Sequence, residues 1–114
     1  MAGYRRAMIA TNDIVTVSIA CGSDTEAQTI ARSLVEQRLA ACVQSHAITS
    51  TYAWQGAIET APEVMLTAKT VAGKLDALEA AVRTMHSYEV PEILATPVAY
   101  ASASYAAWVR SCVS

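Results

Sequence analysis

The sequence of 114 residues contains no phenylalanine, and only 16% of its residues are charged, against about a quarter in an average protein. Hydrophobic residues make up 54% of the chain, and 23 residues are alanine. This much apolar surface excludes an intrinsically disordered chain. The low charge indicates that a partner subunit, rather than water, covers part of the apolar surface.

Basic residues are few and scattered. The eight Lys and Arg residues include only one adjacent pair, Arg5-Arg6, and the net charge is −2. A nucleic-acid-binding protein usually carries a basic stripe, so the sequence predicts no nucleic-acid partner. Thr11, Asn12 and Asp13 interrupt the apolar stretch that follows this pair. We therefore expect no signal peptide, no transmembrane helix, no membrane partner and a cytoplasmic location.

The three cysteines, Cys21, Cys42 and Cys112, form an odd set without CxxC spacing, which predicts free thiols. Cys21 precedes a predicted helix, whose N-terminus would lower the pKa of the thiol, so we expect it to be the most reactive of the three. Cys21 is then either a metal or redox ligand or a small buried structural residue. Cys42 is expected in the core.

Residues 1–12 show no clear period and are expected to form a frayed tail before a single domain over residues 13–114. The predicted elements are a strand over 13–20, a helix from 24 to about 40, strands over 42–54 and 57–70, a helix from 71 to 85, a strand over 93–100 and a short last helix. This order predicts an α+β, ferredoxin-like (split β-α-β) domain with a C-terminal helix.

Local signals mark several boundaries of these elements. Ser23 and Glu26 fit a capping box, in which the Glu26 side chain reaches back to the first turn of the helix. Gln55-Gly56 fits a two-residue hairpin turn that needs positive φ. Pro62 predicts a bulge or a locally unpaired edge in the second hairpin strand, since proline cannot donate to a ladder. Thr70 is expected to cap the second helix.

The predicted hairpin is long for this fold. Each arm of about twelve residues spans roughly 40 Å at about 3.3 Å per residue, whereas helices of about sixteen residues span about 24 Å. The hairpin tip, with Tyr52 and Trp54, should therefore extend beyond the rest of the domain. An extended aromatic edge favours aggregation unless another chain pairs with it, so we expect oligomerisation through strands, with Trp54 in a subunit interface.

The densest group of polar residues comprises Lys69, His86, Tyr88, Glu89 and Glu92. His86 could bind a transition metal with Glu89 as a supporting oxygen ligand. The alternative is that His86 caps carbonyl groups at the end of the second helix. Lys69 ends a different strand, and the sequence leaves open whether it approaches this loop within one chain.

Taken together, five motifs resemble the CutA family of divalent-cation tolerance proteins over about residues 14–112. They are Arg38-Leu39-Ala40-Ala41-Cys42-Val43, Ile48-Thr49-Ser50-Thr51-Tyr52-Ala53-Trp54-Gln55-Gly56, Lys69-Thr70, His86-Ser87-Tyr88-Glu89-Val90-Pro91-Glu92-Ile93 and Tyr105-Ala106-Ala107-Trp108-Val109. The chain departs from the family at Ser87, where the family usually has proline, so we expect a less rigid loop after His86.

The resemblance implies a homotrimer similar to the PII signal proteins, a cytoplasmic location and a link to copper and other divalent cations. It implies metal ligands among His86, Cys21 and Glu89. It also implies a ligand-binding cleft between subunits. The cleft residues implied are Lys69, Trp54 and Tyr88.

Three functions are compatible with this sequence. The first is a trimeric, non-enzymatic metal-response protein that binds a divalent cation. The second is a PII-like sensor that binds a small anion through Lys69. The third, a small hydrolase, is the least favoured, because the sequence has no Ser-His-Asp set, P-loop or GxGxxG motif. We therefore predict no catalytic residues and no organic cofactor.

Overall fold

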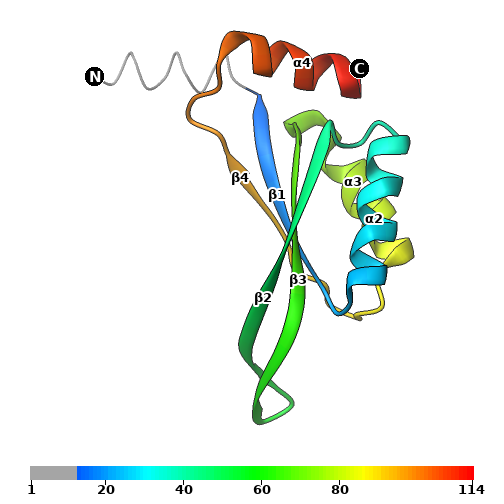
Figure 1. The fold of residues 1–114 in the computed structure, drawn as a ribbon, viewed down its shortest axis with the longest axis vertical. Helices are drawn as coiled ribbons and strands as arrows, with labels where there is room; N and C mark the ends of the chain where they lie inside the picture. The colour runs from blue at the N-terminus through cyan, green and yellow to red at the C-terminus, as the bar shows by residue number, and fades with distance from the viewer. Residues whose placement is uncertain (1–12) are drawn as a thin grey trace.

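Four antiparallel strands form one sheet in the computed structural model, which describes residues 13–114 (Figure 1). The elements are β1 (Ile14–Cys21), α2 (Asp24–Glu36), β2 (Cys42–Trp54), β3 (Ala57–Val71), a 3-10 turn (Ala72–Lys74), α3 (Leu75–Met85), β4 (Ile93–Pro97) and α4 (Ala103–Val113). The predicted α+β, ferredoxin-like class is confirmed, while the predicted tail over 1–12 lies outside the described residues. None of the described helices is long and apolar enough to cross a membrane.

The strand order is β2-β3-β1-β4, so β1 lies between β3 and β4. The β1–β3 ladder runs from Ile14↔Val71 to Cys21↔Val64. This order is that of a split β-α-β domain, in which the first strand occupies a central place. It leaves β2 and β4 as the two edges of the described sheet.

Helices α2 and α3 cover one face of the sheet (Figure 1). Strand β1 turns Val17 and Ile19 to this side, where they join Ile30 of α2 and Val82 of α3 with no exposed surface. Full burial of such a side chain stabilises the fold by roughly 1.5–3 kcal/mol. Residues that alternate with them along the strands lie on the opposite face, which α2 and α3 do not cover.

A second, smaller core lies where α4 meets the end of the sheet (Figure 1). Val109 and Val113 of α4 pack there with Ile14 and Ala41. Ser102 caps the start of this helix, and its hydroxyl accepts a hydrogen bond from the Tyr105 N–H at 3.3 Å.

Helix α2 ends at Glu36, four residues before its predicted end. Arg38 has a φ of 60°. Its N–H donates to the Val35 carbonyl at 3.0 Å, and the Leu39 N–H donates to the Leu34 carbonyl at 2.9 Å. These two bonds form a Schellman motif, which also brings apolar residues together at the helix end. Leu39 continues the apolar period of α2, but it lies in the C-terminal cap and not in the helix itself.

Two further predicted boundaries are wrong. Thr70 does not cap α3, because it lies fully buried in β3 and the 3-10 turn separates it from the helix. Its hydroxyl has no hydrogen-bond partner among the described residues. Strand β4 stops at Pro97, three residues early, although the next residue, Val98, still donates its N–H to the Ile14 carbonyl at 3.1 Å.

The structure confirms the predicted hairpin turn at Gln55-Gly56. Gln55 and Gly56 have φ values of 50° and 82°, the positive pair that a type I′ turn requires. Pro62 makes no bulge, since its pairing with Thr49 continues the β2–β3 register. It lies beyond the last β1–β3 pair, where β3 has no second neighbour in the described sheet. The hairpin extends past both helices, as predicted (Figure 1).

Candidate functional site

His86, at the end of α3, fixes the loop over residues 86–92 to the sheet. Its side chain has no exposed surface. The ring Nε2 lies 2.7 Å from the Ala20 carbonyl oxygen, and the Tyr88 N–H donates to the ring Nδ1 at 3.0 Å. Nδ1 is therefore an acceptor and Nε2 carries the proton. Both nitrogens are engaged, so a bond to a metal would require one of these contacts to break.

Glu26 holds the same loop from the side of α2. The predicted capping box is only half formed: the Ser23 hydroxyl accepts from the Glu26 N–H at 3.2 Å, but the Glu26 carboxylate does not reach back. Instead it accepts hydrogen bonds from the backbone N–H of Ser87 and from the Ser87 hydroxyl, the latter at 3.0 Å. A proline at this position could donate neither bond. Ser87 thus restrains the loop through hydrogen bonds where a proline ring would restrain it through φ.

The Tyr88 side chain extends from the loop past Gly22 to the face of the sheet opposite α2 and α3. A Cβ atom on Gly22 would lie 2.9 Å from the Tyr88 hydroxyl oxygen, so glycine is needed for this close approach. The Tyr88 hydroxyl donates to Glu63 Oε2 at 2.7 Å. Burial, followed by the hydrogen bond to Glu63 and its charge, raises the pKa of Tyr88 well above its usual range. The phenol therefore stays protonated and acts as a neutral donor.

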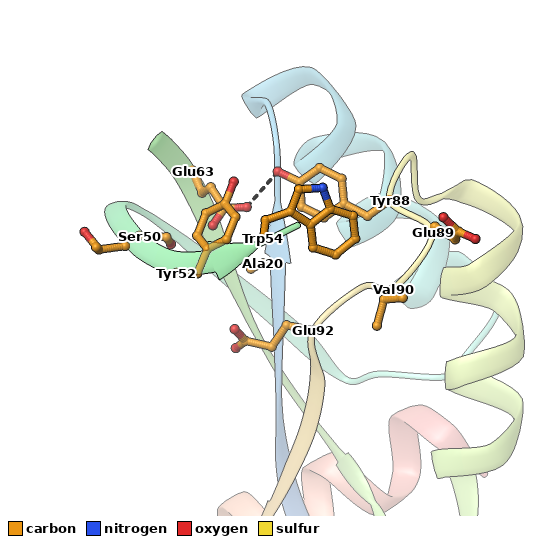
Figure 2. Close-up of a pocket in the computed structure, with 10 residues that line it drawn as sticks. Ala20, Ser50, Tyr52, Trp54, Glu63, Tyr88, Glu89, Val90 and Glu92 are labelled. Carbon is orange, nitrogen blue, oxygen red and sulfur yellow. Dashed lines mark hydrogen bonds between the residues drawn. The ribbon is translucent and has the colours of Figure 1, made fainter. Parts of the chain in front are cut away.

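These contacts form one wall of a cavity of about 640 Å³ (Figure 2). Its lining contains three carboxylates, three aromatic rings and no Lys, Arg or His among the described residues. The lining residues are Ala20, Ser50, Thr51, Tyr52, Trp54, Glu63, Tyr88, Glu89, Val90 and Glu92. Glu63 is only 8% exposed. The size falls within the range typical of small-molecule sites.

The cavity lies next to the hairpin, on the face of the sheet opposite α2 and α3. Ala20 pairs with Met65, one position away from the core pair Ile19↔Leu66, and Glu63 pairs with Ile48 of β2. Alternation along a strand therefore turns the Ala20 and Glu63 side chains away from the helices.

Three of the predicted site residues, Trp54, Tyr88 and Glu89, line this cavity, but Lys69 does not. Lys69 pairs with Thr16 and Cys42, six residues along β3 from Glu63, or about 20 Å at about 3.3 Å per residue. Its ammonium donates to the side-chain oxygen of Gln44. A single chain therefore does not bring Lys69 to Trp54 and Tyr88.

The expected reactivity of Cys21 is wrong in direction. Cys21 ends β1 with no exposed surface, and its burial, aided by the charges of Glu26 and Glu63, raises the pKa of the thiol to about 11. Desolvation outweighs the start of α2, so the buried structural alternative fits. Cys42, expected in the core, is only partly buried, as is Cys112, and all three cysteines are free thiols.

Within residues 13–114, no three His, Cys, Asp or Glu side chains are grouped so that they could hold a metal ion. His86, Cys21 and Glu89, predicted as metal ligands, therefore do not form such a group in one chain. His86 and Cys21 face the protein interior, while Glu89 is exposed.

Sequence reasoning missed Glu63, Glu26 and Gly22. A carboxylate inside an apolar strand is unusual, and Glu63, between Pro62 and Val64, carries that signal. The sequence around Glu26 indicates only a helix cap, because its hydrogen bonds to Ser87 span 61 positions. Gly22 has no local signal for its role, because its contact with Tyr88 joins residues far apart in the sequence.

Comparison with known proteins agrees with the fold. Residues 15–112 match the model of the family described as CutA1 divalent ion tolerance protein. The chain is 40% identical to the protein CutA homolog of Xenopus laevis, over 97% of this chain and 78% of that protein. It is 42% identical to the divalent-cation tolerance protein CutA of Thermus thermophilus, over 82% of this chain and 92% of that protein.

A solved structure gives the same result in three dimensions. The periplasmic divalent cation tolerance protein CutA from Archaeoglobus fulgidus superposes with a TM-score of 0.87 at 35% identity, covering 89% of this chain and 99% of that one. The family match, the sequence identities and the shared fold together place the chain: it belongs to the CutA1 divalent ion tolerance family.

Proposed function

We propose that this chain is a non-enzymatic divalent-cation response protein that binds copper or another divalent cation as a homotrimer. The observation that carries the proposal is the acidic cavity, whose lining within residues 13–114 contains Glu63, Glu89 and Glu92 but no basic side chain. A negative field of this kind concentrates cations and repels anions. Membership of a divalent-cation tolerance family supports the same choice.

A homotrimer agrees with the low charge and with the exposed edge of β2. This strand has 13 residues and pairs only with β3 in the described sheet, and Trp54 at its tip is 47% exposed. A free edge of this length favours pairing with another chain. A metal site shared between subunits would then gain ligands that one chain lacks.

Light scattering at low micromolar concentration tests the assembly. The expected mass is three times 12.1 kDa, about 36 kDa, without dissociation on dilution. A monodisperse monomer would contradict both the homotrimer and the role given to the β2 edge.

Calorimetric titration with Cu(II) tests the metal role. We expect saturable binding to the purified chain, weakened several-fold in Glu89→Gln, because Glu89 is an exposed carboxylate on the cavity loop.

Glu59→Gln is the matched control, since Glu59 is an exposed carboxylate of β3 outside the cavity. His86→Ala and Cys21→Ala test the two remaining predicted ligands, and we expect smaller effects because both side chains are buried. No saturable Cu(II) binding by the unmodified chain would reject the proposal.

The alternative is a PII-like sensor that binds an anion through Lys69. In one chain Lys69 lies along β3 from the cavity and its ammonium is bound to Gln44, so no contact of the described residues favours this function. An anion that bound the assembled protein and was lost in Lys69→Ala would support it over the metal role.

We further propose a cytoplasmic location, which the sequence predicts. The Archaeoglobus fulgidus relative is described as periplasmic, so the two locations need a direct comparison. Fractionation of source cells, with a marker protein for each compartment, should recover the chain with the cytoplasmic marker.

A further inference from the structure

The cavity next to the hairpin contains a buried carboxylate whose charge has no cationic partner among the residues that the structure describes. Glu63 is 8% exposed, and its partner among the described residues is the Tyr88 hydroxyl, bound to Oε2. Glu89 and Glu92 add negative charge, and none of the lining residues is basic. Buried carboxylates in proteins are almost always paired with a cation, because burial removes the water that would stabilise their charge.

Tyr88 does not supply that missing charge. Its pKa is raised by burial and by the hydrogen bond to Glu63, so the phenol remains a neutral donor. It also donates to only one of the two carboxylate oxygens, Glu63 Oε2. The second oxygen is therefore available to a ligand that enters the cavity (Figure 2).

The lining favours an organic cation over a metal ion at Glu63. The described carboxylates do not form a group that could hold a metal. Three aromatic rings, those of Tyr52, Trp54 and Tyr88, line the same cavity. Aromatic faces attract ammonium and guanidinium groups, whereas a divalent metal needs several converging oxygen or nitrogen ligands.

We propose that the cavity bounded by Glu63, Tyr52 and Trp54 binds a small organic cation, whose ammonium or guanidinium group pairs with the Glu63 carboxylate. The aromatic rings contact the ligand, and Glu89 and Glu92 attract it electrostatically. The site shares its cavity with the metal role proposed above, but it depends on Glu63 and the aromatic rings and needs neither a metal ion nor histidine and cysteine ligands.

Three molecules with the same four-carbon skeleton test the proposal. 1,4-Diaminobutane is a dication, 1,4-butanediol is neutral and succinate is a dianion. Binding is measured by calorimetry and by the fluorescence of Trp54, in a Trp108→Phe background that leaves Trp54 as the single tryptophan. We expect saturable binding of 1,4-diaminobutane alone, at one site per chain, weakening as salt is added.

Matched variants locate the charge. Glu63→Gln keeps the shape and an acceptor for Tyr88 but removes the charge, and we expect at least a tenfold loss of affinity for 1,4-diaminobutane. Trp54→Leu, made with Trp108 present and followed by calorimetry, should cost roughly two- to fivefold, as expected for an exposed cation–π contact. Glu59→Gln, which removes an exposed carboxylate outside the cavity, should change affinity by less than twofold.

Each other outcome overturns the proposal. No saturable signal from 1,4-diaminobutane, equal binding of 1,4-butanediol, unchanged affinity in Glu63→Gln or an equal loss in Glu59→Gln would each show that Glu63 does not recognise a cation. Binding of succinate in place of the diamine would assign the cavity to anions. A Cu(II) titration of Glu63→Gln is run in parallel, and unaltered copper affinity separates this site from the proposed metal role.

Discussion

The two ends of β3 place ionisable side chains in different surroundings. Glu63, toward the hairpin, is 8% exposed, is held by the Tyr88 phenol and faces an acidic cavity. Lys69, at the other end, is partly buried and donates to the neutral side chain of Gln44. The same sheet face thus has an acidic end with an open site and a basic end whose side chain already has a partner.

The two ends also differ in the elements that pack against them. The acidic end joins β1, α2 and the 86–92 loop through His86 and Glu26, and it holds the cavity. The opposite end is closed by α4 and its small apolar core. A change at one end should therefore leave the other largely unaffected, which the following measurements test.

The largest expected effect is a loss of stability at alkaline pH from Cys21. The folded chain holds the Cys21 proton up to a pKa of about 11, whereas the unfolded chain releases it near the ordinary value of 9.0. Stability is thus full below pH 9 and falls as pH rises toward 11, at about 1.4 kcal/mol per pH unit, or roughly 3 kcal/mol in all. Urea unfolding at fixed protein concentration between pH 8 and 11 measures this slope.

Two alanine variants test whether Cys21 causes this pH dependence of stability. Cys21→Ala should flatten the pH dependence between pH 9 and 10, before the tyrosines, whose pKa values are also raised, begin to contribute. Cys112→Ala, at a partly buried cysteine of α4, should retain the full slope. Equal slopes in the two variants would show that Cys21 is not the titrating group.

A smaller effect is expected from Tyr88→Phe, which removes the hydroxyl that holds Glu63. The buried carboxylate loses its partner among the described residues, at a cost of about 2 kcal/mol in the free energy of unfolding. Tyr100→Phe, at a side chain that is 75% exposed, should change stability by less than about 0.5 kcal/mol. A double-mutant cycle with Glu63→Gln isolates the contact, and additive effects would contradict it.

Much of the fold could be predicted because its signals are local. Alternating apolar residues located β1, and Gln55-Gly56 located the hairpin turn, since each pattern depends on neighbours in the sequence. Helix ends were less reliable. Leu39 continues the helical period as part of a Schellman motif, and Thr70 is polar yet buried in a strand.

The candidate site could be predicted only in part, because it is built from long-range contacts. Trp54, Tyr88 and Glu89 were found through their motifs, and they do share a cavity. Glu63 joins them through a hydrogen bond that spans 25 positions, which no local pattern contains. Lys69 belongs to the same set of family motifs, but the strand register places it six residues from Glu63 along β3.

The smallest effect is expected at the opposite end, from Arg38→Ala. The guanidinium donates to the Ser111 carbonyl at 3.0 Å and to the Ser114 carbonyl at 3.2 Å, near the C-terminal end of α4. A cation there interacts favourably with the helix dipole, and exposure limits the gain, so the loss should be about 0.5–1 kcal/mol. Arg38→Gly loses the same bonds but relieves the positive φ of 60°, and should recover about 1 kcal/mol relative to Arg38→Ala.

Hydrogen exchange decides whether this effect stays at its own end. In Arg38→Ala the amides of α4 should exchange faster, while those of β1 near Ala20, whose carbonyl oxygen contacts His86, should not change. Arg38→Gly should also leave α4 less protected, even with stability restored, because glycine cannot contact the α4 carbonyls. Faster exchange at β1 next to His86 in either variant would show that the two ends of the sheet are coupled, and the comparison between them would fail.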